Sequence, residues 1–362
     1  MRLPSDDEVA LRDACRDVLA RHTTSARLRL TSESETGFDP DFWKLAAELG
    51  WTALAVPGAA GGLDGTVSML AVVGVELGRA LQPGPLLQTL AASHVIGRHG
   101  EPGAVQDLLD AVVAGQAVLT WGGFEPDSPS TVDQRGGTLH GHVELVPDAP
   151  SSTHLLLPFV RDVDSSPSLA LVELAACRVT ATPTMDLTRR YATVSVDGVA
   201  YRDLGLPAGA GRRLFDVGVV LQCAESTGVA RRLLDMTVTY SGQREQFGRA
   251  IGSFQALKHR MADMLVETEG CRVATREAAD ALDGSEAGGR SVGVASSWVG
   301  RAASFVATHA LQIHGGVGFS WEHDLHLFLR RAKTNELLLG SPGWHDERLY
   351  RSLLPSGVPG AS

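Results

Sequence analysis

An arginine, a phenylalanine and a glycine stand close together in the stretch REQFGRAIGSFQALKHRMAD, which covers residues 244–263. The Arg244 guanidinium can donate hydrogen bonds to two phosphate oxygens at once. The ring of Phe247 offers a flat face that can cover an adenine. Because the stretch joins two long helical patterns through a glycine-marked turn, it predicts a ligand-binding helix junction. The alternative is a plain helix–turn–helix with a core phenylalanine and a surface arginine.

A second stretch, ALQIHGGVG at residues 310–318, ends another helical pattern. Its glycines, Gly315, Gly316 and Gly318, allow the backbone to lie directly against a ligand. The pattern is not a phosphate-binding P-loop, because no Gly-Lys-Ser/Thr follows. It is not a Rossmann fingerprint either, because it ends a helix and does not follow a strand. The alternative is an ordinary helix C-cap.

The elements that must hold these stretches form three groups along the chain. Residues 5–114 have helical periodicity, and residues 116–205 contain short β-branched runs separated by turn signals. Four long helical patterns then follow, at residues 214–240, 254–282, 293–314 and 322–339. The sequence therefore predicts an α+β multi-domain protein. We expect an N-terminal helical domain (1–115), a middle small antiparallel β-barrel or sandwich (116–208), and a C-terminal four-helix bundle (209–362).

The composition excludes several classes of protein. The 362 residues carry a formal net charge of −10, which argues against nucleic-acid binding. The four cysteines are scattered without a CxxC pair, and no N-terminal signal or membrane-length apolar run is present, so we expect a cytoplasmic protein without membrane attachment. His323, His326 and His345 lack further ligands at metal-binding spacing, so we expect no metal site.

Both glycine-marked stretches resemble the acyl-CoA dehydrogenase family. The first is similar to its flavin-binding signature RxxFGxxIxxFQ, and the second is similar to its QxxGGxG turn. The N-terminal order PGAAGGLDG, followed by a helix with ELGRAL, also looks like this family. The resemblance implies an FAD-dependent α,β-dehydrogenation of an acyl-CoA thioester, a homo- or heterotetramer, and an electron-transfer flavoprotein as acceptor.

The resemblance also implies roles for particular residues at a flavin bound mainly to a neighbouring subunit. Arg244 would meet the pyrophosphate, and Phe247 would pack beside the adenine. The remaining residues of this wall would be Gln246, Gln312, Gly315 and Gly316.

The catalytic base of the family is missing from both of its usual positions. In one branch a glutamate precedes a Gly-Thr after the RxAK helix, and Leu339 stands at that place. In the other branch the glutamate lies on the first bundle helix, at the position of Gly218. Glu225 lies two helical turns beyond Gly218 on nearly the same face. Burial raises the pKa of a carboxyl group, which suits a general base, so Glu225 is the candidate; Asp216 is a weaker one. The alternative for Glu225 is a structural acid bonded to a neighbouring helix.

The middle domain departs from the family as well. In the loop at residues 121–128 and the strand at residues 143–149, most of the hydroxyl and indole groups that hold the flavin ring in the family are missing. A retained outer wall with an eroded ring site resembles the β-type partner subunit of heterotetrameric acyl-CoA dehydrogenases. Two other hypotheses stay open: a self-sufficient homotetramer that uses Glu225, and a non-catalytic homologue.

Overall fold

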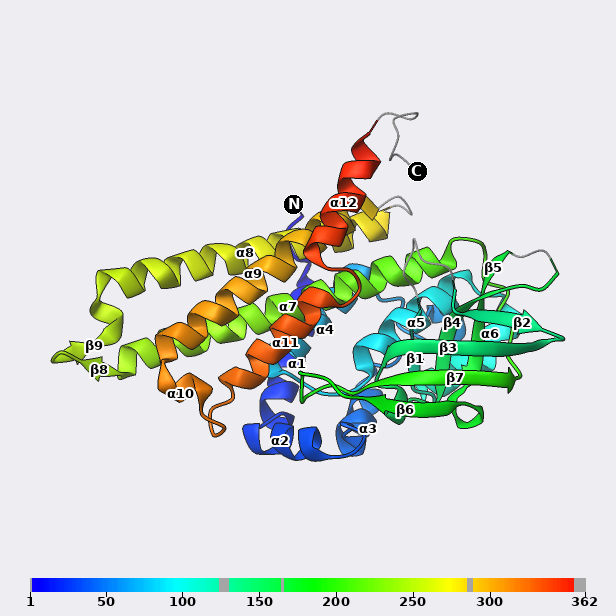
Figure 1. The fold of residues 1–362 in the computed structure, drawn as a ribbon, viewed down its shortest axis with the longest axis horizontal. Coiled ribbons are helices and arrows are strands. Elements are labelled where there is room, and N and C mark those ends of the chain that lie inside the picture. The colour runs from blue at the N-terminus through cyan, green and yellow to red at the C-terminus, as the bar shows by residue number, and fades with distance from the viewer. Residues whose placement is uncertain (1, 124–129, 164–165, 285–288, 355–362) are drawn as a thin grey trace. The chain divides into compact units, whose positions relative to one another are not determined.

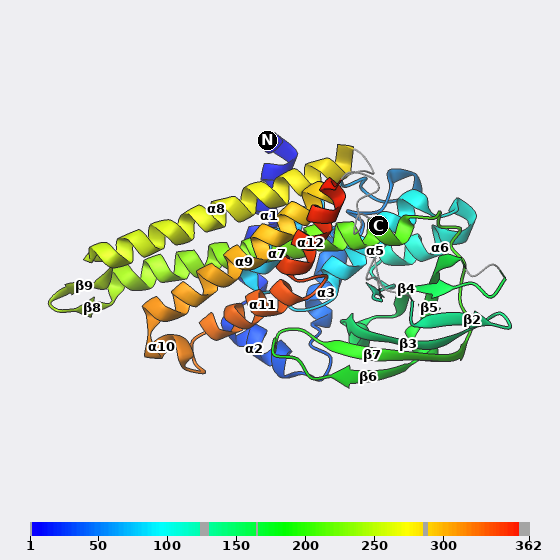
Figure 2. The same cartoon turned by 45° about the horizontal axis from the view of Figure 1, so that its top comes forward.

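The structure is a computed structural model that describes residues 2–123, 130–163, 166–284 and 289–354 (Figures 1 and 2). The chain forms two compact units, each built from separate segments. The first unit comprises Met1–Ser25, Val67–Gln82 and Val219–Ser362, and the second comprises Ala26–Thr66 and Pro83–Gly218.

The first unit is helical, and its long helices lie side by side (Figures 1 and 2). All four long helices predicted for the C-terminal half are present as α7, α8, α9 and α11, while α10 and α12 are additional. The helices of this unit are α1 (Asp6–His22), α4 (Val67–Ala80), the part of α7 (Ala210–Gln243) from residue 219 onward, α8 (Gln255–Gly284), α9 (Gly289–His314), α10 (Gly316–Phe319), α11 (Leu325–Leu337) and α12 (Pro342–Leu353).

Two glycines bring α4 and α7 into backbone contact. A Cβ atom on Gly78 of α4 would lie 2.0 Å from the carbonyl oxygen of Glu225 on α7. A Cβ atom on Gly228 of α7 would lie 2.0 Å from the carbonyl oxygen of Val75 on α4. Neither position therefore accepts a side chain, and the ELGRAL stretch has its glycine for this packing.

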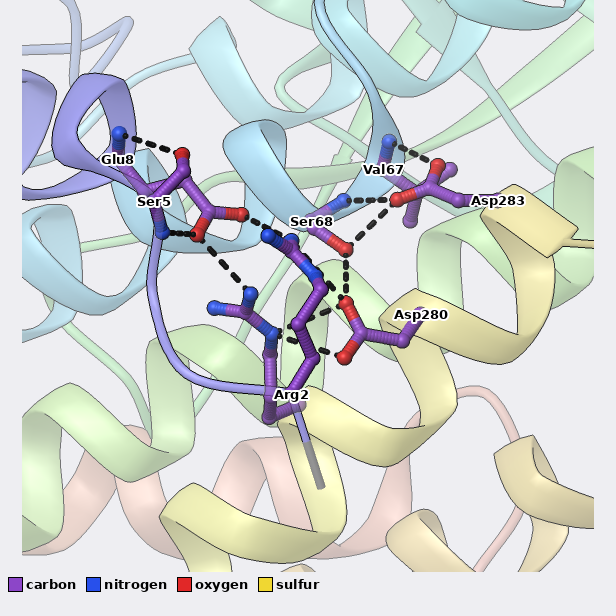
Figure 3. Close-up of polar contacts among 8 residues, drawn as sticks. Arg2, Ser5, Glu8, Val67, Ser68, Asp280 and Asp283 are labelled. Atoms are coloured by element: carbon purple, nitrogen blue, oxygen red, sulfur yellow. Dashed lines mark hydrogen bonds and ion pairs between the residues drawn. The ribbon is translucent and has the colours of Figure 1, made fainter.

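A polar network joins the start of α4 to the end of α8 (Figure 3). The Asp283 carboxylate accepts hydrogen bonds from the backbone N–H groups of Val67 (2.7 Å) and Ser68 (3.0 Å). It thereby satisfies two backbone N–H groups at the N-terminus of α4. Nearby, Ser5 and Glu8 form a capping box at the start of α1. Arg2, Arg276 and Asp280 complete the network.

The second unit contains one seven-stranded sheet, with β1, β4, β2, β3, β7 and β6 in order and β5 paired to β4. Its core is formed by the alternate inward side chains of these strands, such as Leu139, Val143 and Val194. The helices of this unit are α2 (Ser25–Glu33), α3 (Pro40–Glu48), α5 (Leu86–His99) and α6 (Pro102–Val113). The strands are β1 (Leu119–Trp121), β2 (Val132–Arg135), β3 (Thr138–Pro147), β4 (His154–Val160), β5 (Pro167–Glu173), β6 (Arg178–Thr182) and β7 (Tyr191–Val199).

The predicted order of a helical, a β and a second helical segment is confirmed. The sheet differs from the expected antiparallel one in two pairings, because β1 and β2 each run parallel to β4. The short strand β1 enters from α6 and not from a hairpin, so its direction is not tied to that of β4. The domain bounds at residues 115 and 208 stay a prediction. Among the helices that the structure describes, none has the length and apolar character needed to cross a membrane.

Candidate functional site

Arg244 and Phe247 lie in a small hairpin between α7 and α8. Strand β8 (Glu245–Gln246) pairs with β9 (Arg249–Ala250), which leaves Phe247 and Gly248 as a two-residue turn. Both turn residues have positive φ angles, 52° and 77°. A two-residue hairpin turn of this kind requires positive φ, which is unusual for phenylalanine. The Phe247 side chain is 92% exposed, so it is not a core residue, and the plain helix–turn–helix alternative does not hold.

The hairpin presents the Arg244 side chain to solvent. The Arg244 backbone N–H donates to Tyr240 (2.8 Å), and its carbonyl accepts from the N–H of Ile251 (2.8 Å). Within the residues that the structure describes, the Arg244 guanidinium has no hydrogen-bond or ion-pair partner. The other arginine of the hairpin differs, because the Arg249 guanidinium lies 4.2 Å above the Phe254 ring. Arg244 is therefore the hairpin cation that is available to an anionic ligand.

The second stretch forms the turn between α9 and α10. Gly315 has a φ of 59°, which favours glycine, and Gly316 begins α10. A Cβ atom on Gly316 would meet nothing within 4 Å. Since this fold leaves open space there, its own packing gives no reason for a glycine at position 316. Gln312 is exposed beside this turn. The sequence interpretation missed two exposed aromatic residues of the same region, Phe319 and Trp321, because exposure cannot be read from residue type.

Within the second unit, Gly218 packs against Trp121. A Cβ atom on Gly218 would lie 2.2 Å from Cζ2 and 2.4 Å from Cη2 of Trp121. The Trp121 side chain is buried, with 3% exposure. This position therefore accepts no side chain, and the indole ring occupies the place where a carboxylate on Gly218 would project.

Leu339 lies in a tightly held turn after α11. It has a φ of 53°, and Gly340 after it has a φ of 90°. The Leu339 carbonyl interacts with Nε2 of the buried His345 at 2.9 Å. Gln222 of α7 donates from Nε2 to the carbonyl of Leu338 at 2.8 Å. These bonds fix the turn. The aliphatic side chain of Leu339 cannot accept a proton.

Glu225 is a member of a buried ion pair. Its carboxylate Oε1 accepts from Nη1 of Arg331 at 2.6 Å, and Oε2 accepts from Nδ2 of Asn335 at 2.9 Å. Glu225 is 1% exposed and Arg331 is 0% exposed. Since both carboxylate oxygens are engaged by α11, the geometry favours the structural alternative for Glu225. The weaker candidate, Asp216, accepts from Nε of Arg212 through both oxygens, at 3.0 and 3.1 Å.

We expect Arg331→Met to lower the free energy of unfolding by about 3 to 5 kcal/mol, because it leaves the Glu225 carboxylate buried without its cation. The double variant Glu225→Leu/Arg331→Met should lose much less, because both charges are removed together. Urea denaturation measures both changes. The matched control is Arg351→Ala, which removes a half-exposed pair with Glu347 and should cost about 0.5 kcal/mol or less. A loss below about 1 kcal/mol in the single variant would contradict this assignment.

The three histidines do not share a site. His323 Nδ1 accepts from the N–H of Leu325 at 3.1 Å, and His326 stacks on Trp321 at 5.0 Å. No group of three metal-ligating side chains is found in the described ranges. The loop expected to position a flavin ring lies partly outside the described residues, which stop at residue 123 and resume at 130.

Two family models match the chain: "Acyl-CoA dehydrogenase, N-terminal domain" over residues 5–116 and "Acyl-CoA dehydrogenase, C-terminal domain" over residues 210–354. Acyl-CoA dehydrogenase IpdE2 of Mycolicibacterium smegmatis is 34% identical over 93% of this chain and 96% of its own length. A solved variant of the Tcur3481-Tcur3483 steroid ACAD is 30% identical with a TM-score of 0.87, over 95% of this chain and 97% of that chain. The ChsE4-ChsE5 complex of Mycobacterium tuberculosis is 27% identical with a TM-score of 0.90, over 98% of this chain and 100% of that chain.

Proposed function

Because the chain belongs to the acyl-CoA dehydrogenase family, whose members act on CH–CH bonds of acyl-CoA, we propose that it is one subunit of a heteromeric, FAD-dependent acyl-CoA dehydrogenase. In that assembly it contributes an exposed edge to a flavin site shared with a related partner chain. When bound, FAD supplies the oxidising chemistry of α,β-dehydrogenation. The exposed edge consists of Arg244, Gln246, Phe247, Gln312, Gly315 and Gly316.

The geometry of the exposed edge fits a dinucleotide. The uncompensated Arg244 guanidinium is suited to the negative pyrophosphate, which it would bind through two hydrogen bonds. Phe247 packs perpendicular to the Phe254 ring at a centroid distance of 6.1 Å and remains 92% exposed, so its ring is accessible to the adenine. The open space at Gly316 allows the ligand to approach the backbone, where a side chain would block it. These groups are displayed outward, so they suit a cofactor held largely by another chain.

The proposal of a heteromer is supported chiefly by one observation: the positions at which the family has its catalytic base are occupied by other groups in this chain. The Gly218 position is closed by the Trp121 indole, and Leu339 is aliphatic. The Glu225 carboxylate is bonded to Arg331 and Asn335. Proton abstraction from the carbon α to the thioester needs a carboxylate base, which the partner chain would supply. Two similar solved structures, the Tcur3481-Tcur3483 steroid ACAD and the ChsE4-ChsE5 complex, each carry two protein names, which supports a paired assembly.

The further features of the proposal follow from the same assembly. We propose a tetramer with two copies of each chain, in the cytoplasm, that passes electrons to an electron-transfer flavoprotein. The substrate is an acyl-CoA thioester. Since one similar structure is described as a steroid ACAD, steroid-derived CoA thioesters are the first substrates to test.

The visible absorption spectrum of the purified chain tests the proposal. Expressed alone, the chain should be colourless and inactive; co-expressed with an acyl-CoA dehydrogenase chain encoded beside it, it should yield a yellow complex that oxidises an acyl-CoA. We expect one FAD for each pair of unlike chains. Stoichiometric flavin and turnover by the chain alone would support the homotetramer, and absence of flavin from every combination would support a non-catalytic homologue.

The same complex tests Glu225 as a base. We expect a Glu225→Gln complex that folds to retain turnover, because the base lies on the partner chain; its stability should fall, because the amide leaves the buried Arg331 cation without a carboxylate. A loss of turnover in a variant that still folds and binds FAD would restore Glu225 as the base.

A further inference from the structure

The two halves of the exposed edge, the hairpin after α7 and the glycine turn after α9, are joined by a stacked pair of rings. The rings of Tyr240 on α7 and His314 on α9 stack with their centroids 4.4 Å apart and an interplanar angle of 19°. The Tyr240 hydroxyl also lies 3.4 Å from the His314 carbonyl oxygen. His314 directly precedes Gly315, and the Tyr240 carbonyl accepts the backbone N–H of Arg244 at 2.8 Å. A short series of contacts therefore connects the hairpin to the glycine turn.

The His314 ring is fixed in orientation and in charge. It is 3% exposed, and its Nδ1 lies 2.8 Å from the Ala310 carbonyl, so Nδ1 carries the proton. The edge of the His323 ring packs beside it, at a centroid distance of 5.1 Å. Burial lowers the pKa of His314, against a smaller opposing effect of the bond to Ala310. The stack is thus made by a neutral imidazole ring that cannot rotate freely.

We propose that Tyr240 and His314 are a positioning pair that sets the separation between Arg244 and the Gly315–Gly316 turn. This inference rests on the proposed function, because that separation matters only if one dinucleotide contacts both. A ligand of fixed length binds both groups at little entropic cost when they are already correctly spaced. Neither ring needs to touch the cofactor for this role.

Hydrogen exchange of the unassembled chain tests the pair without any flavin. The backbone N–H groups of Arg244 and Ile251 report on the hairpin, and those of Gly315 and Gly318 report on the turn, because all four are hydrogen-bonded. We expect Tyr240→Ala to speed exchange about fivefold at both segments, since an aromatic pair stabilises the contact that joins them. Tyr240→Phe keeps two flat rings and should keep the parental rates.

The matched control is Tyr350→Ala on α12, which removes an exposed aromatic ring and should leave both segments unchanged. Unchanged exchange at Gly315 and Gly318 in Tyr240→Ala would overturn the inference, because loss of the Tyr240 ring would then affect α7 and not the glycine turn after α9. Exchange that rises equally throughout the first unit would also overturn it, since the pair would then be part of the general core.

FAD binding by the co-expressed complex is the second measurement. Tyr240→Ala should raise the FAD dissociation constant about tenfold, and Tyr240→Phe should keep the parental constant. If Tyr240→Ala speeds exchange while not even the parental complex binds FAD, the proposed function fails and the structural link between the segments stands. If the parental complex binds FAD and Tyr240→Ala binds it equally well, the positioning role is wrong and the proposed function stands.

Discussion

Gly218→Glu is expected to prevent the chain from folding and not to give it a catalytic base. The first added atom would lie 2.2 Å from the indole of Trp121, and the carboxylate would be buried against an aromatic ring. Overpacking costs about 1 to 3 kcal/mol, and an unpaired buried charge adds several more. The sum is comparable with the whole stability of a typical domain, about 5 to 15 kcal/mol. Soluble yield and the thermal unfolding midpoint measure the effect.

A second substitution distinguishes this clash from a general intolerance of α7. Trp121→Ala alone should cost about 3 to 5 kcal/mol, because it leaves a cavity. In Trp121→Ala/Gly218→Glu the new side chain enters that cavity, so the double variant should be more stable than Gly218→Glu alone. A Gly218→Glu chain that folds with the parental midpoint would show that Trp121 does not occupy the position.

The residues proposed for the exposed edge could be selected from the sequence because they fall in two short stretches of the chain. Arg244, Phe247 and the paired glycines form two short patterns, and each pattern lies in a turn that the helical periodicity already indicates. The hairpin itself could not be predicted. Phenylalanine rarely adopts positive φ, so the local sequence gives no reason to place Phe247 in a two-residue turn.

The contacts that explain the missing base are distant in sequence, so they required the structure. The partner of Gly218 is Trp121, which the sequence shows only as part of an apolar run before a loop. Periodicity correctly placed Glu225 on an apolar helix face, but it could not show that Arg331 is fully buried opposite it. Arginine is seldom buried without a partner, and residue type alone does not identify that partner.

The helices, too, were predictable where their sequence pattern is long and local. Long amphipathic patterns predicted α7, α8 and α9, whereas α12 was missed although its start carries a local signal. Ser341 accepts a hydrogen bond from the N–H of Trp344 (3.3 Å), and Pro342 is the first helical residue. The joining of α4 to the end of α8 through Asp283 lies beyond any local signal, because the two segments are separated by most of the chain.

FAD binding by the assembled heteromer carrying Arg244→Ala tests the shared flavin site most directly. Arg244 has no other partner among the described residues, so its removal should affect the ligand and not the fold. The lost charge-assisted hydrogen bonds are worth about 1.5 to 3 kcal/mol, which predicts a dissociation constant roughly 10 to 100 times higher. Arg244→Lys keeps the charge without the paired donors, so its FAD dissociation constant should lie between those of the parent and Arg244→Ala.

Arg21→Ala, at an exposed arginine near the end of α1 that bonds to the Asp17 carbonyl, is the matched control and should bind FAD as the parent does. Isothermal titration of the flavin-free complexes with FAD gives the constants, and circular dichroism confirms that each variant is folded. If Arg244→Ala binds FAD weakly while Arg21→Ala binds it normally, this chain contributes to the flavin site. If Arg244→Ala binds FAD with the parental dissociation constant, it does not.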